Sequence, residues 1–295
     1  MTFPRPLTAA GAVLALGLLA GCGDDEPAAR PTPSPATSDV ATESSSTPPT
    51  ASPSDQASAV PAYYVGETPQ GDRLYREFLQ VAGADRLVAT AAAITSGDPV
   101  DPDYRTLWPK GRFASVEKTA DAIVVALPDD TWVSAGSLKP AQARLAVQQL
   151  VYSLQGAAGA RLPVRVTLDG EPAATLLGVP VGDGLSAAPE LDVLALVNVT
   201  EPAEGTAVSG SFTATGRSSS FEATVAWEIQ DADGKVVLEG SAMAEGWIDK
   251  LYPWTTEVDV SELPPGDYTF VARTDDPSGG EGGGPTEDTK RITIT

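Results

Sequence analysis

Cys22 is the only cysteine in the 295-residue sequence, and it comes directly after an apolar run and one glycine. The run extends from Leu7 to Ala20, follows the single positive charge of Arg5 and ends in small residues. A basic start, an apolar middle and a small-residue cleavage site are typical of a secretory signal peptide. We therefore expect residues 1–21 to be a signal peptide. A chain with one cysteine cannot form an intrachain disulfide, so its core alone must stabilise the fold.

The four residues at the predicted cleavage site are Leu19, Ala20, Gly21 and Cys22. They resemble the bacterial lipobox, in which a leucine and two small residues precede a cysteine. The resemblance implies that Cys22 is acylated and becomes the mature N-terminus. The apolar run has 14 residues, fewer than the roughly 20 that a membrane-spanning helix needs. We predict a protein held at the extracytoplasmic face of the cell membrane by lipid on Cys22.

The charge balance and the histidine content exclude several classes of function. The formal net charge is −21, which repels phosphate backbones, so we expect no nucleic-acid partner. The sequence contains no histidine. Ser-His-Asp and Cys-His catalysis and histidine-ligated metals are therefore excluded. Carboxylate chemistry, a serine–lysine pair and oxygen-ligated calcium remain.

A serine–lysine pair is the first of these alternatives. Ser115-Val116-Glu117-Lys118 matches the S-x-x-K motif of penicillin-binding enzymes, in which the serine begins a helix that brings the lysine beside it. Here the motif leads into a β-rich run, and the S-D-N and K-T-G motifs that accompany it elsewhere are missing. We interpret the match as a chance one.

Calcium is the second alternative. Asp231 and Asp233-Gly234 resemble the start of a calcium loop, but Val237 and Ala242 stand where later oxygen ligands are needed. A hairpin turn explains aspartate and glycine at this spacing directly. We therefore favour a turn here.

The remaining carboxylates show no catalytic signature. Asp275, Asp276 and Glu281 form a looser acidic cluster in a Gly-rich loop, for which we favour a solvated loop and keep weak calcium binding as the alternative. A glycosidase would need two carboxyl groups roughly 5–9 Å apart, and no motif selects such a pair. We predict no catalytic residue, no metal site and no cofactor.

Residues 22–58 are rich in Ser, Thr, Pro, Ala and acidic residues. Such a segment cannot bury enough apolar surface to offset the entropy lost on ordering. We predict a disordered stalk that separates the folded domains from the membrane.

Residues 59–189 combine strand and helix patterns. Two helices are expected, one over 84–95 and one after an N-cap at Ser137. Strands are expected over 60–65, 73–79, 123–127 and 164–168, the first ended by Gly66 and the last by the turn Asp169-Gly170. This order is typical of a small α+β domain.

The helical period disappears after about Pro189, and residues 190–295 show only short strands. Strands are expected near 221–229, 235–239, 254–260, 267–273 and 291–295. In the first of them, the apolar face runs from Phe221 through Trp227 to Ile229, and Glu228 is on the polar face. Short strands separated by Pro and Gly at regular spacing predict a β-sandwich of about 100 residues.

Two stretches in residues 142–170 carry a resemblance to a known family. Residues 142–154 (QARLAVQQLVYSL) and 164–170 (VRVTLDG) resemble the end of a GerMN domain of the sporulation and germination type. Residues 221–225 (FEATV) and 231–235 (DADGK) resemble the immunoglobulin-like domain that often follows GerMN in bacterial envelope proteins. Together the resemblances cover about residues 60–295. They imply a non-catalytic surface lipoprotein and offer no catalytic motif to carry across.

Aromatic residues cluster in one Gly/Pro-flanked segment, residues 246–254. If Trp247, Tyr252 and Trp254 were exposed, they would form a platform for a protein or a sugar. The alternative is that at least two of them pack into the sandwich. We take the three as candidate partner-binding residues.

These observations predict an α+β GerMN-like domain followed by an immunoglobulin-like sandwich, on a lipid anchor and stalk. We expect both domains to mediate protein interactions at the outer face of the membrane, in sporulation, germination or general envelope processes. A cell-wall glycan or small-solute binding module is the alternative, and a carboxylate-dependent hydrolase is disfavoured. Self-association is left open, because GerMN-like folds resemble ring-forming modules only at the level of the fold.

Overall fold

The computed structural model describes residues 58–81, 85–96, 98–276, 279–281 and 283–295. The predicted signal peptide lies outside the described residues, and so does the predicted stalk up to residue 57. The described residues belong to one compact unit. Within the described ranges, no helix is both long and apolar enough to span a membrane.

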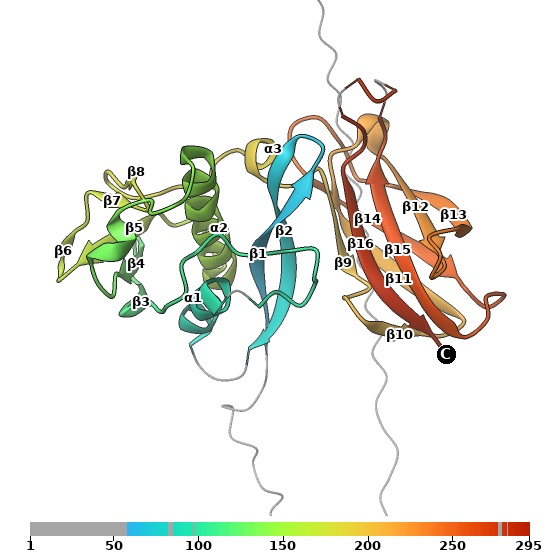
Figure 1. The fold of residues 1–295 in the computed structure, drawn as a ribbon, viewed down its shortest axis with the longest axis horizontal. Helices are drawn as coiled ribbons and strands as arrows, with labels where there is room; N and C mark the ends of the chain where they lie inside the picture. The colour runs from blue at the N-terminus through green and yellow to red at the C-terminus, as the bar shows by residue number, and fades with distance from the viewer. Residues whose placement is uncertain (1–57, 82–84, 97, 277–278, 282) are drawn as a thin grey trace, which may run out of the picture. The chain divides into compact units, whose positions relative to one another are not determined.

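The N-terminal half of this unit is an α+β domain (Figure 1). Its elements are β1 (Ser58–Thr68), β2 (Gly71–Val81), α1 (Arg86–Ser96), β3 (Ser115–Lys118), β4 (Ile123–Ala126), α2 (Pro140–Ala158), β5 (Val164–Leu168), β6 (Glu171–Pro172), β7 (Thr175–Leu176) and β8 (Val179–Pro180). β1 and β2 form an antiparallel hairpin, and a second sheet has the order β3-β4-β5-β6 with β4 and β5 parallel. Figure 1 shows α1 and α2 between this sheet and the hairpin, and both helices contact β1.

The spacing of apolar residues in the sequence correctly predicted the helix α2. Ala143, Val147, Leu150 and Leu154 were expected on one face, and all four are buried. The predicted N-cap at Ser137 is wrong, because Lys139 is the N-cap and Pro140 begins the helix. Proline suits the first helical position, where its missing N–H costs nothing. The Gln142 side chain accepts a hydrogen bond from the Lys139 backbone N–H and fixes this start.

The predicted end of the first strand at Gly66 is also wrong, because β1 continues to Thr68. The glycine has a packing role instead. A Cβ at this position would lie 2.7 Å from the ring of Tyr75, so only glycine lets the two strands pair here. The predicted Asp169-Gly170 turn joins β5 to β6, and both residues have positive φ, as a two-residue hairpin turn requires.

The C-terminal half is a β-sandwich domain, which follows the short helix α3 (Glu190–Val193). Its elements are β9 (Val197–Glu201), β10 (Thr206–Val208), β11 (Ser211–Ser218), the 3₁₀ turn η2 (Phe221–Ala223), β12 (Thr224–Gln230), β13 (Val236–Met243), β14 (Tyr252–Asp259), β15 (Gly266–Thr274) and β16 (Glu287–Ile294). One sheet has the order β10-β16-β15-β12-β13 and the other β14-β11-β9. The core joins them, with Ile229 and Phe270 from the first sheet and Val199 and Val258 from the second.

Four details differ from the sequence-based expectations for this half. The strands β9, β10 and β11 were not expected, because no strand of this half was predicted before residue 221. The helix α3 lies just beyond Pro189, where only strands were expected. Phe221 belongs to the turn η2 rather than to β12, and its side chain is exposed. Glu228, expected on the polar face, is buried and pairs with Arg273 at 2.5 Å. The fold class itself, an α+β domain followed by an immunoglobulin-like sandwich, is confirmed.

Candidate interaction surfaces

The three residues of the predicted aromatic platform differ in exposure: Trp254 is buried, whereas Trp247 and Tyr252 are half-buried. Trp254 is 3% exposed, and its indole lies in the sandwich core beside Gly216, where a Cβ would come 2.6 Å from the ring. This buried indole cannot contact a partner while the sandwich is folded. The expectation that Trp254 presents a free surface is therefore corrected, because the indole fills the room that Gly216 leaves.

Trp247 and Tyr252 are half-buried near one end of the sandwich. The Trp247 ring meets Phe221 edge-on, with centroids 5.1 Å apart. The Tyr252 hydroxyl donates to Asp249 Oδ1 at 2.8 Å, and Lys250 Nζ lies 4.8 Å from the Tyr252 ring centroid. Their role in binding a partner stays a prediction.

The other predicted positions fall into two groups. Leu19, Ala20, Gly21 and Cys22 lie outside the described residues. Ser115 and Lys118 lie in the strand β3 instead of at a helix start, and Lys118 Nζ donates to the Ala158 carbonyl at 2.9 Å. Residues three apart in a strand point to opposite faces, so this pair lacks the geometry of the S-x-x-K motif.

The predicted turn at Asp231 has a clear structural basis. Asp231 Oδ1 accepts hydrogen bonds from the backbone N–H groups of Asp233 and Lys235, at 3.0 and 2.9 Å. The carboxylate thus closes the loop between β12 and β13. Among the residues that the structure describes, no group of three or more His, Cys, Asp or Glu side chains could hold a metal ion.

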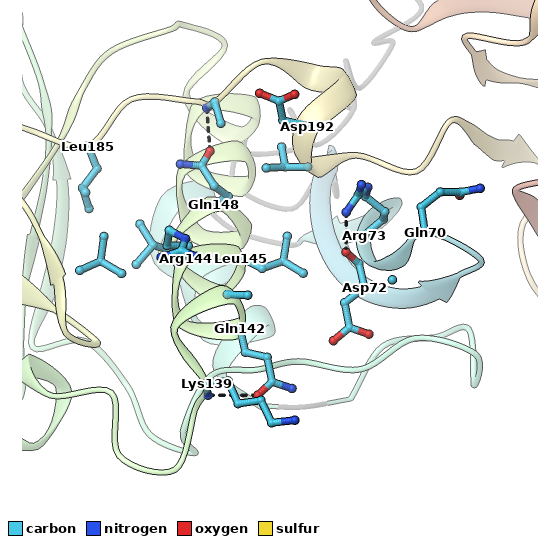
Figure 2. Close-up of a pocket in the computed structure, with 16 residues that line it drawn as sticks. Gln70, Asp72, Arg73, Lys139, Gln142, Arg144, Leu145, Gln148, Leu185 and Asp192 are labelled. Atoms are coloured by element: carbon cyan, nitrogen blue, oxygen red, sulfur yellow. Dashed lines mark hydrogen bonds between the residues drawn. The ribbon is translucent and has the colours of Figure 1, made fainter. Parts of the chain in front are cut away.

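A groove of about 770 Å³ lies along the outer face of α2 (Figure 2). One wall is the tip of the β1–β2 hairpin, and the other comes from β8, α3 and the segment that joins them. Ala141, Arg144, Leu145 and Gln148 line it from α2, at the i, i+3, i+4, i+7 spacing of one helix face. Gln148 fixes the second wall, because its Oε1 accepts from the Ala188 N–H at 2.8 Å and its Nε2 donates to the Ser186 carbonyl at 3.2 Å.

The groove carries three cationic side chains, those of Arg73, Lys139 and Arg144. None of them forms an ion pair within the part of the chain that the structure describes; Arg73 Nη1 donates only to the backbone carbonyl of Asp72, at 3.2 Å. The Asp72 carboxylate is bound by Arg105 at 2.6 Å. Asp192 is the lining carboxylate that forms no ion pair with another described residue. The groove is therefore locally cationic in a chain of net charge −21.

A buried polar network joins the α+β domain to the sandwich, and sequence reasoning missed it. Lys290 Nζ donates to Asp101 Oδ2 at 2.6 Å, to Asp288 Oδ1 at 2.9 Å and to the Tyr104 hydroxyl at 2.8 Å. The Tyr104 hydroxyl donates in turn to Asp288 Oδ1 at 2.5 Å. Asp101 and Tyr104 come from the loop after α1, whereas Asp288 and Lys290 come from β16.

Further hydrogen bonds hold the carboxylates of this network. Asp288 Oδ2 accepts from the side-chain amide of Asn198 at 2.9 Å and from the Val199 N–H at 2.6 Å. Glu77 on β2 accepts from the backbone N–H groups of Val100 and Asp101, at 3.2 and 2.7 Å. Every carboxylate of the network is thus hydrogen-bonded, as buried charges require.

The network shifts the ionisation of its members. Burial alone would lower the pKa of Lys290, but the carboxylates of Asp288 and Asp101 outweigh this and raise it above the ordinary value. Burial raises the pKa of Asp101, because the desolvation of its carboxylate outweighs the stabilising charge of Lys290, and the Asp288 carboxylate adds to the rise. Burial also raises the pKa of Glu77. The pKa of Tyr104 lies well above its ordinary value through burial and the neighbouring Asp288 and Asp101 carboxylates.

Comparisons with known families decide what these domains are. The family described as sporulation and spore germination matches residues 61–174. The family described as the immunoglobulin-like domain of bacterial spore germination matches residues 196–281. The chain therefore contains a GerMN-type domain and a germination-type immunoglobulin-like domain. The predicted resemblance is confirmed for both; the groove lies on the GerMN domain and the segment that follows it, and the buried network joins this domain to the immunoglobulin-like one.

Solved structures resemble the chain only distantly. The tandem GerMN domains of the sporulation protein GerM from Bacillus subtilis are 16% identical, over 70% of this chain and 63% of that one, with a TM-score of 0.36. CopC from Methylosinus trichosporium OB3b is 25% identical, over 33% of this chain and 92% of that one, with a TM-score of 0.23. The match thus spans less than two thirds of the GerM structure. A search of curated proteins gave no significant match.

Proposed function

We propose that the protein is a non-catalytic, lipid-anchored interaction protein of the cell envelope, acting at the outer face of the membrane. Acylated Cys22 supplies the anchor, and the GerMN and immunoglobulin-like domains recognise an envelope protein. The process is sporulation, germination or a more general function of the envelope.

The observation that carries this proposal is the groove along α2. It combines apolar side chains with cations that no carboxylate of the described chain neutralises, which suits a site that binds a partner. A glycosidase places two carboxyl groups around the bond it cleaves. The groove offers Asp192 alone, since Asp72 is bound by Arg105. The arrangement therefore favours binding over carboxylate catalysis.

Two further observations support an interaction role. The two matched families are described by spore germination and by an immunoglobulin-like fold, and neither description names a reaction. The lipobox resemblance at residues 19–22 supports the anchor. A cell-wall glycan or a small solute is the second candidate ligand, which the half-exposed rings of Trp247 and Tyr252 would suit.

Affinity capture tests the proposal. Tagged full-length protein is purified from detergent-solubilised envelopes beside Cys22→Ser, which lacks the acylation site. We expect one stoichiometric envelope protein to copurify with the native sequence and to be missing from Cys22→Ser. A clean preparation without any partner would refute the proposal, and calorimetric titration with soluble wall fragments would then test the glycan alternative.

A further inference from the structure

We propose that the groove along α2 binds an acidic, apolar peptide segment of a partner protein, with its carboxylates paired to Arg73, Lys139 and Arg144. The inference rests on the proposed interaction function and names the chemistry of the partner. It goes beyond that function in naming a class of ligand and the residues that select it.

The charge of the groove favours an anionic ligand. Some basic side chains of the described residues pair with carboxylates, for example Arg105 with Asp72 and Arg291 with Glu204, whereas isolated ones such as Arg112 do not. What distinguishes the groove is that three unpaired cations lie together. The three cations of the groove have no carboxylate partner among the described residues, and they come from β2, from the N-cap of α2 and from α2 itself. In a chain of net charge −21, cations that converge on one hollow without internal partners complement an anionic ligand.

The apolar lining between the cations favours a peptide over a free inorganic anion. The half-buried Val179 and Val193 line the groove, and the buried Leu145 and Leu185 form its floor. A free inorganic anion would gain nothing from these side chains, whereas a peptide with leucine or valine between its acidic residues would cover them. The volume of about 770 Å³ fits several residues of such a segment.

Membranes, nucleic acids and sugars fit the groove less well than an acidic peptide does. A membrane surface or a nucleic-acid backbone extends beyond the groove and would face the acidic remainder of a chain of net charge −21, whereas a short peptide would contact the cationic groove alone. No aromatic side chain is among the residues that line the groove, so a sugar ring finds no face on which to stack. An acidic peptide is the ligand that uses both the cations and the apolar side chains.

The carboxylate of Asp192 predicts how the peptide is oriented along the groove. Figure 2 shows Asp192 near the α3 end of the groove and Lys139 at the start of α2. Acidic residues of the ligand are expected near Lys139 and Arg144, and a neutral or basic residue near Asp192.

Fluorescence anisotropy with a defined probe tests the inference. The probe is a fluorescein-labelled octapeptide of alternating leucine and aspartate, titrated with the full-length protein in a neutral detergent. Matched probes carry asparagine or lysine in place of aspartate. We expect the aspartate probe to bind saturably and at least about tenfold more tightly than the asparagine probe, with an affinity that falls as salt rises.

Two variants each add a carboxylate to the groove, and the first also removes a cation. Arg144→Glu should weaken binding of the aspartate probe by about tenfold, because an attraction becomes a repulsion. Ala141→Glu should do the same although it adds an acidic residue to the first turn of α2, which favours the helix. Arg112→Glu, at an exposed arginine outside the groove, is the matched control and should change the affinity by less than about twofold.

Equal binding of the aspartate and asparagine probes, or equal effects of Arg144→Glu and Arg112→Glu, would overturn the inference. The proposed function fails separately, because it depends on capture of an envelope protein. If that protein is captured equally by the native sequence and by Arg144→Glu, the interaction function stands and the groove is not its site. If no probe binds and no protein is captured, both fall.

Discussion

Replacing Lys290 by methionine tests whether the two domains are coupled through the buried network. Lys290 is 4% exposed and donates to three oxygen atoms, those of Asp101, Asp288 and Tyr104. Removing one partner of a buried ion pair typically costs about 3–5 kcal/mol, because the remaining charge is left uncompensated. Lys290→Met leaves two such carboxylates, and we expect it to lower the free energy of unfolding by about 3–5 kcal/mol.

Urea unfolding followed by tryptophan fluorescence measures this loss. Trp108 and Trp132 report on the GerMN core, and Trp227 and Trp254 report on the sandwich core. We expect one transition for the native sequence and two for Lys290→Met, because the ammonium group bonds residues of both domains.

Matched variants separate the charge from the packing. Lys235→Met removes an exposed lysine from a turn of the sandwich and should leave the free energy of unfolding within about 0.5 kcal/mol. Adding Asp101→Asn and Asp288→Asn to Lys290→Met should recover part of the loss, since the buried charges are then gone. A loss below about 1 kcal/mol for Lys290→Met with one shared transition would refute the reasoning.

Three further predictions follow from other parts of the structure. Gly216→Ala should lower the free energy of unfolding by at least about 1–3 kcal/mol, because its Cβ would overlap the Asn198 carbonyl oxygen of β9 and lie 2.6 Å from the Trp254 ring. Gly266→Ala places its Cβ no closer than 3.7 Å to a ring atom and should cost less in the same urea assay. The free energy of unfolding should fall above about pH 10, because the raised pKa of Tyr104 makes the folded chain keep a proton that the unfolded chain loses; Tyr104→Phe should flatten this alkaline limb, and an unchanged slope would contradict the assignment. An alkyne-tagged fatty acid should label the full-length protein in cells and fail to label Cys22→Ser, and equal labelling would refute the predicted anchor.

Most helices and strands were predicted from the sequence, because the spacing of apolar residues and the turn-forming residues between them determine these elements locally. The apolar spacing of α2 and the Asp169-Gly170 turn depend on residues close together in the chain. Errors arose where tertiary packing decided the outcome. Gly66 suggested a strand end, yet its missing side chain makes room for the Tyr75 ring. Trp254 was a candidate partner-binding residue with core packing as the alternative, and Gly216 decides for the core by leaving room for the indole.

The buried network could not be predicted in the same way. Asp288, Lys290, Ile292 and Ile294 alternate on the buried face of β16, but the sequence-based strand began only at Arg291. Charged residues such as Asp288 and Lys290 are usually expected on a solvent-exposed face. Their partners Tyr104 and Asp101, which make their burial possible, are more than 180 residues away in the chain. The groove was missed for a similar reason, because its cations come from β2 and α2, which only the fold brings together.

Photo-cross-linking in intact envelopes tests the central claim of a lipid-anchored interaction protein most directly. A photoreactive amino acid replaces Ala141, an exposed residue in the groove, in the full-length protein and in Cys22→Ser. We expect one discrete protein adduct on irradiation of cells with the anchored form, and its loss in Cys22→Ser. No protein adduct with the anchored form, or the same adduct without the anchor, would contradict the claim.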